Sequence, residues 1–224
     1  MGIPLRDISR QPVHRPVITV SIIVINALVF VLELVGGEPF IQKWSVVPAT
    51  IVAGQHWVTI LTAMFTHAGW MHIIGNMVFL WAFGPEIEDA MGPVRYLVFY
   101  LFGGVVAFLA QIAAASSSTV PNLGASGAIA AVMGAFLITY PRDRIKTLLF
   151  LGWFITVTAI PAAVLIGIWF LLQLFSQIGA VAQAQSGGGV AYMAHVGGFI
   201  FGVITAKLFE DRRRIAAQAR NWVS

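Results

Sequence analysis

The chain of 224 residues contains no cysteine and few charged residues. Without cysteine it forms no disulfide bond and offers no thiolate to a metal or a substrate. Charged residues make up 10% of it, against roughly 25% in typical soluble domains. Hydrophobic residues make up 58%, and the mean hydropathy is +0.87. This composition predicts a multi-pass membrane protein in a lipid bilayer, and the net charge of +4 does not indicate a nucleic-acid partner.

The apolar runs are long enough to form transmembrane helices, which need roughly 20 residues each. The run from Ile145 to Gln177 is too long for one helix, and Pro161 is expected to interrupt it. We therefore interpret 145–157 as an interfacial approach to the fifth span. The six expected spans are 17–36, 70–90, 95–115, 124–140, 158–176 and 190–209.

These spans predict an all-α bundle of six transmembrane helices that forms a single membrane domain. The expected parts are a cytoplasmic segment 1–16, a six-helix core 17–209 and a basic cytoplasmic tail 210–224. Of the 13 Lys and Arg residues, all except Lys43 fall on one side of this arrangement. Positive residues gather on the cytoplasmic side of membrane proteins, so we expect both termini there.

Three loops are then expected on the outer side. Loop 37–69 is apolar and is expected to form short amphipathic helices in the membrane interface. Loop 116–123 precedes the fourth span, and loop 177–189 is rich in Gly, Ala and Gln and is expected to act as a movable cap.

Strongly polar residues inside spans are candidates for function, because burying them in lipid is unfavourable. His72 and Asn76 lie near the outer end of the second span, Ser126 at the start of the fourth and His195 near the outer end of the sixth. Even-numbered spans share their outer ends, so these groups converge at one depth. Histidine can take the proton of a serine hydroxyl, which activates it as a nucleophile. His67 lies outside the span and is expected to support the site.

His72 and Asn76 are four residues apart, so both project from one face of a helix. Both can donate hydrogen bonds to the oxyanion that develops during acyl transfer. Each candidate also has a structural alternative. Ser126 can be a small residue in a helix contact, His195 a buried histidine with a hydrogen bond, and His72 with Asn76 a polar pair between helices.

Two other classes of function are disfavoured. A zinc site is conceivable from three histidines, but the H-E-x-x-H pattern is absent, so we expect no metal and no other cofactor. A small transporter is disfavoured because the chain has no inverted repeat and no pair of carboxylates inside the membrane.

Small residues indicate where the helices meet. Gly198 and Gly202 form a G-x-x-x-G pattern shortly after His195, and Gly127 and Gly134 place small residues on the fourth span. The close contact that these residues allow is what a Ser–His hydrogen bond requires.

A charged group is expected at the cytoplasmic turn after the second span. It consists of Glu86, Glu88, Asp89 and Arg95, which we interpret as a structural cluster of helix caps and ion pairs.

Four motifs occur in order: "HAGWMHIIGN", "GPEIEDAMG", "GASG" and "AHVGGFIFG". Together they resemble the rhomboid intramembrane serine proteases over residues 40–210. The resemblance implies that Ser126 is the nucleophile and His195 the general base. It implies that His72 and Asn76 stabilise the oxyanion and that Glu88 is a structural glutamate.

The resemblance also implies the activity and its setting. We expect cleavage of transmembrane segments through an acyl-enzyme, in the minimal six-span form of a bacterial inner membrane, with the active site open to the extracytoplasmic side. The alternative is a non-proteolytic relative that holds membrane clients. The implied partners are a transmembrane protein substrate and the lipid bilayer, with no nucleic acid.

Some members carry an aromatic residue four positions after the nucleophile that stacks on the histidine. Here that position is Ala130, so the sequence leaves the orientation of His195 open.

Overall fold

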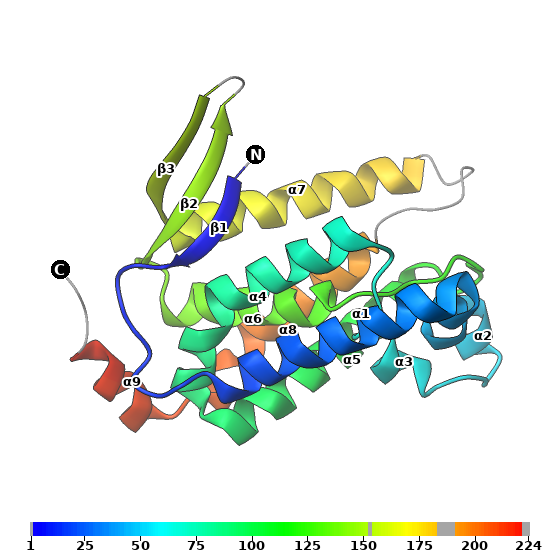
Figure 1. The fold of residues 1–224 in the computed structure, drawn as a ribbon, viewed down its shortest axis with the longest axis horizontal. Coiled ribbons are helices and arrows are strands. Elements are labelled where there is room, and N and C mark those ends of the chain that lie inside the picture. Colours follow the sequence, from blue (N-terminus) through cyan, green and yellow to red (C-terminus); the bar gives the residue numbers. More distant parts are fainter. Residues whose placement is uncertain (1, 152–153, 183–190, 221–224) are drawn as a thin grey trace.

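The computed structural model describes residues 2–151, 154–182 and 191–220. Its main helices run roughly along one direction, with two short helices at one end and a small sheet and α9 at the other (Figure 1). The helices are α1 (Val17–Trp44), α2 (Pro48–Val52), α3 (Thr59–Thr62), α4 (Trp70–Met91), α5 (Pro93–Ala114), α6 (Ser126–Thr139), α7 (Ala162–Ala182), α8 (Tyr192–Phe209) and α9 (Arg212–Ala219).

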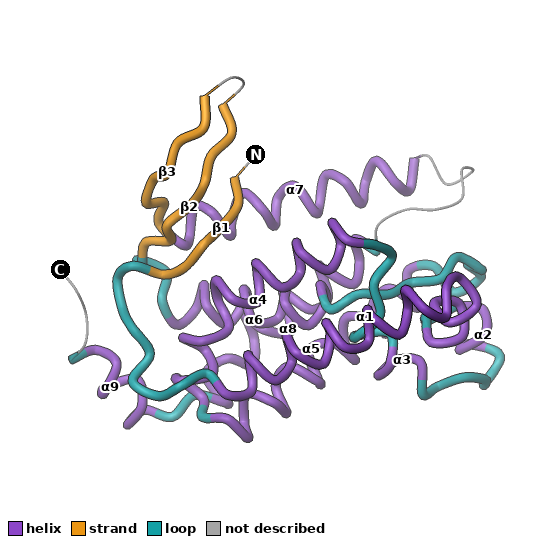
Figure 2. Tube along the Cα trace, viewed as in Figure 1, coloured by secondary structure: helices purple, strands orange, loops and turns teal. Residues whose placement is uncertain are grey.

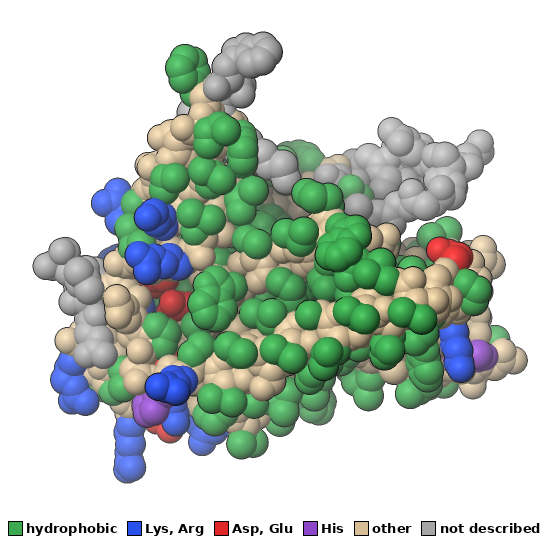
Figure 3. All heavy atoms as spheres, in the orientation of Figure 1, with side chains coloured by type: hydrophobic (Ala, Val, Ile, Leu, Met, Phe, Trp, Pro, Cys, Tyr) green, Lys and Arg blue, Asp and Glu red, His purple; other side chains and the backbone are tan. Residues whose placement is uncertain are grey.

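The long helices have the length and composition of membrane spans. Among the described helices, α1, α5 and α8 are long and apolar enough to cross a membrane, and α6 and the first part of α7 are shorter apolar helices. Large apolar side chains on α1 face outward, among them Leu28 and Val35, and apolar side chains cover much of the visible surface (Figure 3). Such a surface suits lipid rather than water. The predicted helical membrane bundle is confirmed, while the number of spans stays a prediction.

The helix boundaries lie close to the expected spans, except that α1 extends beyond residue 36 and α7 runs from Ala162 to Ala182 where 158–176 was expected. α1 continues to Trp44, but Gly37 has a non-helical backbone (φ 61°, ψ −158°). Regular helix therefore ends where the first span was expected to end. The outer segment that follows contains the short helices α2 and α3.

Helix α6 occupies the centre of the bundle and is buried from Gly127 to Phe136. It contacts α4, α5 and α8. A Cβ atom on Gly198 would lie 2.0 Å from the carbonyl oxygen of Gly127, and one on Gly202 would lie 2.0 Å from that of Ala131. The backbones of α6 and α8 therefore touch, at a separation that only glycine permits.

The segment after α6 differs from the prediction. Residues 145–157 were expected as an interfacial approach, but they form most of two antiparallel strands, β2 (Arg144–Leu151) and β3 (Phe154–Pro161). Pro161 ends β3 and does not interrupt a helix. β-Branched residues such as Thr156, Val157 and Thr158 favour strands. Ile145 and Thr147 of β2 are buried, whereas Arg144 is exposed, which is the alternation of a strand.

The third strand comes from the chain's N-terminal region. β1 (Gly2–Asp7) pairs with β2, with Gly2 opposite Leu149 and Asp7 opposite Ile145 (Figure 2). The expected all-α architecture is therefore wrong for this part of the chain: the helical bundle carries a three-stranded sheet, which lies against α4 and α7.

Two carboxylates of α4 anchor the start of α1. Glu88 accepts hydrogen bonds from the N–H groups of Ile18 (2.8 Å) and Thr19 (2.7 Å) and from the Thr19 hydroxyl (2.7 Å). Because the first N–H groups of a helix have no partner within it, Glu88 caps α1 from a neighbouring helix. Asp89 accepts from the N–H of Val13 at 2.7 Å.

Arg95 does not take the role expected of it in this cluster. It donates to the backbone carbonyl of Glu210 at 3.5 Å. The cations beside Asp89 come instead from chain segments far away in sequence: Arg214 at 3.6 Å, and His14, when protonated, at 2.7 Å.

The carboxyl group of Asp7, at the end of β1, should make the stability of the sheet depend on pH. Burial raises the pKa of Asp7 to about 7. A hydrogen bond from Ser9 N–H opposes this rise, and the charge of Asp143 adds to it. The folded state then holds this proton more tightly than the unfolded state, whose pKa is near 3.8. The stabilisation is complete below the unfolded pKa and is lost as the pH rises toward 7. Thermal unfolding between pH 4 and 8 should show this loss, and Asp7→Asn should remove it. An equal slope in both proteins would contradict the assignment.

The backbone contact between α6 and α8 predicts a sharp effect of one methyl group. Gly202→Ala should destabilise the protein by about 1–3 kcal/mol, because the new Cβ would displace the Ala131 carbonyl. Gly167→Ala on α7 is the matched control, because its Cβ would meet nothing within 4 Å. Thermal unfolding in detergent measures both. Equal melting temperatures for the two variants would rule out the tight contact.

Candidate active site

The loop before α6 turns inward at Gly124. This residue has φ +118°, a conformation that favours glycine, and its N–H donates to the carbonyl of Ala63 at 2.8 Å. The turn places Ser126 as the first residue of α6. At such a position the backbone N–H groups have no partner within the helix and the positive end of the helix dipole lies nearby.

Ser126 and His195 are in direct contact. The Ser126 hydroxyl lies 2.7 Å from Nε2 of His195, which is on α8 and is buried. The contact spans 69 residues of sequence and rests on the close approach of α6 and α8 at Gly127 and Gly198. The structure thus brings together the two residues expected to do the chemistry.

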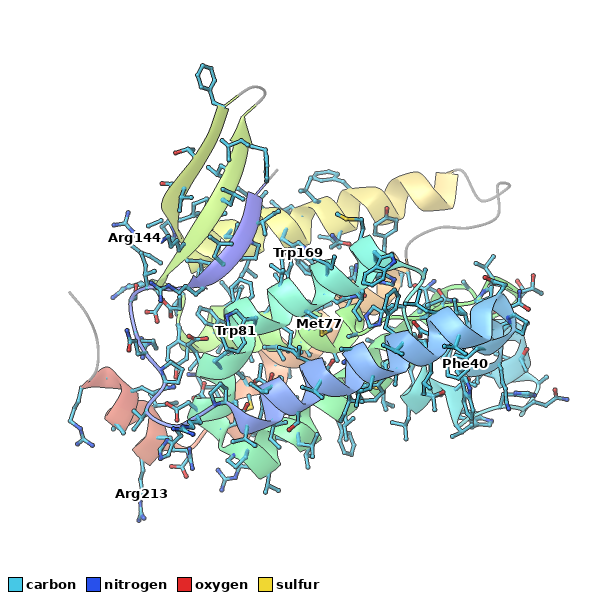
Figure 4. All side chains as sticks on the ribbon, viewed as in Figure 1. Phe40, Met77, Trp81, Arg144, Trp169 and Arg213 are labelled. Atoms are coloured by element: carbon cyan, nitrogen blue, oxygen red, sulfur yellow. The ribbon has the colours of Figure 1, made fainter. Side chains whose placement is uncertain are left out.

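The other ring nitrogen of His195 is held from α7. Nδ1 lies 2.7 Å from Oε1 of Gln173, and this oxygen accepts a hydrogen bond from Nδ1–H. The ring of Trp169, one helical turn earlier, lies 5.8 Å from the His195 ring, and Figure 4 shows it on α7 beside the bundle. Because Oε1 only accepts, the proton of the neutral imidazole sits on Nδ1, and Nε2 is free to accept from Ser126.

Sequence reasoning missed Gln173 and Trp169. The available signal was a Gln inside an apolar run, four residues after a Trp and so on the same face of a helix. The expected family position for a ring beside the histidine is on α6, where Ala130 is buried. The structure supplies the ring from α7 instead.

His72 and Asn76 converge on the turn at Gly124. A Cβ placed there would lie 2.8 Å from His72 Nε2 and 3.7 Å from Asn76 Nδ2. The N–H of Ala68 lies 3.3 Å from His72 Nδ1 and donates to it, which places the proton of the neutral ring on Nε2. Nδ2 of Asn76 is buried and has no hydrogen-bond partner among the residues that the structure describes. Two donors therefore face the region beside Ser126.

His67 supports this region from the outer loop and takes no direct part in the Ser–His contact. Its N–H donates to Glu33 on α1 at 2.9 Å, and its ring packs edge-on against His72 at 5.1 Å. Burial, with a smaller effect of His72, lowers the pKa of His67 to about 4, so its ring is neutral near pH 7. His67 therefore packs against His72 as a neutral ring.

A cleft of about 920 Å³ gives access to these groups. Its lining includes Trp70, His72, Asn76, Asn122, Ser126 and His195. In the part of the chain that the structure describes, no three His, Asp or Glu side chains gather as a metal site would need. The predicted cap 177–189 begins within α7 up to Ala182, and its remainder lies outside the described residues.

This arrangement defines a class: a helical membrane protein with a hydroxyl, an imidazole and two hydrogen-bond donors around one cleft. The model of the rhomboid domain matches residues 54–212, most of the chain. The chain belongs to the rhomboid family.

Similarity to curated proteins extends over more of the chain. It is 27% identical to "Rhomboid protein 1, mitochondrial" of Saccharomyces cerevisiae over 92% of this chain and 58% of that protein. It is 30% identical to "Rhomboid protease GluP" of Bacillus subtilis over 86% of this chain and 34% of that protein. It is 29% identical to "RHOMBOID-like protein 12, mitochondrial" of Arabidopsis thaliana over 81% of this chain and 55% of that protein. The chain therefore spans about a third to three fifths of these relatives.

These relatives support an integral membrane protein. Two of the three are named as mitochondrial, so a bacterial inner membrane stays a prediction.

The unpartnered amide of Asn76 predicts a selective effect on catalysis. Asn76→Ala should lower kcat for a single-pass membrane substrate by roughly 10²–10³-fold and leave KM nearly unchanged, as loss of an oxyanion donor does. Asn26→Ala on α1 is the matched control, because that amide donates to Ile22 of its own helix. An unchanged kcat for Asn76→Ala would exclude the oxyanion role.

Proposed function

We propose that this chain is an intramembrane serine endopeptidase that cleaves transmembrane segments of membrane proteins. The observation that carries the proposal is the 2.7 Å hydrogen bond from the Ser126 hydroxyl to Nε2 of His195 inside an apolar bundle. The name of one relative, a rhomboid protease, supports the same activity.

The first half of the reaction forms an acyl-enzyme. Ser126 Oγ attacks the carbonyl carbon of the substrate while its proton passes to Nε2 of His195. The carbonyl oxygen becomes an oxyanion, which Nε2–H of His72 and the amide of Asn76 stabilise. The intermediate then collapses, the C–N bond breaks, and the imidazolium returns the proton to the leaving amine.

The second half repeats these steps with water. His195 takes a proton from water, the hydroxide attacks the ester carbon, and Ser126 leaves with the proton. The cleft supplies space for an extended substrate segment beside Ser126. A substrate helix must unwind there, because the hydrogen bonds within the helix occupy its carbonyl groups.

The topology and location form part of the proposal. We place the chain in the membrane as a single domain of six spans with both termini cytoplasmic. The arginines at the end of the molecule that carries β1 and α9 support this orientation (Figure 3). The cleft then opens on the extracytoplasmic side, and a bacterial inner membrane is the proposed location. The substrate is a transmembrane protein reached through the lipid bilayer. The alternative, a client-binding relative without activity, has no need of the paired Ser126 and His195.

Labelling with a serine-reactive fluorophosphonate tests the nucleophile. Ser126 Oγ displaces fluoride from phosphorus, so wild-type protein in detergent should be labelled. Ser126→Ala should lose the label, and His195→Ala should lose most of it, because a base contributes roughly 10²–10⁴-fold. Ser118→Ala is the control, since Ser118 lies in the loop before α6. Equal labelling of wild type and Ser126→Ala would overturn the proposal, and so would a model single-pass substrate that both proteins cleave equally.

A further inference from the structure

We infer that Gln173 of α7 is the positioning residue of this site and that, with Trp169, it sets the tautomer and orientation of His195. The inference rests on the proposed function, since it concerns how the same imidazole acts as a base. The resemblance to the family leaves open which group binds the nitrogen of His195 that faces away from Ser126.

The hydrogen-bond pattern carries the first step. Gln173 Oε1 and Ser126 Oγ bind the two nitrogens of His195, each at 2.7 Å. A serine hydroxyl must donate to an unprotonated nitrogen to become a nucleophile. An acceptor at Nδ1 selects the tautomer that leaves Nε2 unprotonated, and it also stabilises the imidazolium that forms when the proton moves. Gln173 thus fills the place that a carboxylate holds in a three-membered serine site.

Packing carries the second step. Trp169 lies 5.8 Å from the His195 ring and 6.3 Å from that of Phe199, both on α8, and Phe170 stacks on Phe199 at 4.2 Å. These aromatic contacts fix α7 against α8 at the turn before Gln173. On the opposite face, α7 exposes apolar residues such as Val164 and Leu171. The side of α7 that carries Trp169 and Gln173 is therefore the side that faces the site.

The surroundings of His195 leave this role to α7. The titratable groups near it are Ser126 on α6, His72 on α4 and Tyr192 on α8 itself. On α5, Ala110 and Ala107 lie against Gly197 and Gly198 of α8 and are small and apolar. On α6, Ala130 has no ring to stack on the imidazole. The described groups around His195 include no carboxylate, so its second hydrogen bond depends on the Gln173 amide.

Two substitutions at Gln173 separate positioning from simple packing. Gln173→Met keeps the length of the side chain and removes the acceptor, so kcat should fall about 10–100-fold with KM changed little. Gln173→Glu restores an acceptor and adds a negative charge that favours the imidazolium. It should recover most of the activity, and the acidic limb of its kcat/KM profile should move to higher pH by roughly one unit.

Gln111→Met on α5 is the matched control, because it makes the same change in a membrane helix at an amide whose Oε1 has no partner in the described part of the chain. It should keep the wild-type kcat and pH profile. Trp169→Leu should lower kcat more than Trp169→Phe, which keeps a ring. Thermal unfolding in detergent verifies that each variant folds, and if Gln173→Met does not fold, the pH profile of Gln173→Glu decides.

The outcomes distinguish this inference from the proposed function. Wild-type protein that cleaves a single-pass substrate no faster than Ser126→Ala would overturn the protease itself. Wild-type cleavage together with a wild-type kcat in Gln173→Met would overturn only the positioning role. An unshifted pH profile in a folded, active Gln173→Glu would do the same. A fall in kcat for Met, recovery for Glu and no effect of Gln111→Met would support it.

Discussion

The contact between the backbones of α6 and α8 is the constraint on which the rest of the site depends. Glycines at 198 and 202 let the two helices meet at the carbonyls of Gly127 and Ala131, where a methyl group would already collide. Without a hydrophobic driving force between helices in lipid, such close packing is a main source of association. The same contact sets the distance between Ser126 and His195. Stability and chemistry therefore rest on one surface.

Around this contact, two polar side chains inside the bundle hold other parts of the structure in place. Glu88 satisfies the first N–H groups of α1, and Gln173 satisfies one nitrogen of His195. The Asn76 amide differs from these, because its Nδ2 is buried, has no partner among the described residues and lies beside Gly124. A buried donor without a partner is unfavourable in a resting protein. It suits a site where negative charge develops only during the reaction.

Helix α7 differs from the central helices in how it is held. Aromatic rings of α7 and α8 join the two helices, and much of the remaining surface of α7 is exposed and apolar. Its first residues adjoin the sheet, whose strand β1 comes from the start of the chain. A helix at the edge of the bundle thus carries the second hydrogen-bond partner of the central histidine. The imidazole is correctly placed only when α7 is packed against α8.

The sequence by itself determined the helical bundle, because long apolar runs in lipid have to satisfy their backbone groups within each segment. It also determined the candidates Ser126, His195, His72 and Asn76, because polar residues are rare in such runs. It could not reveal that β1 joins the sheet, since β1 pairs with a strand that lies about 140 residues later, and pairing between distant strands leaves no local pattern. Only the tertiary structure decided which group would hold His195. That choice depends on how α7 packs against α8, and neither helix encodes this packing alone.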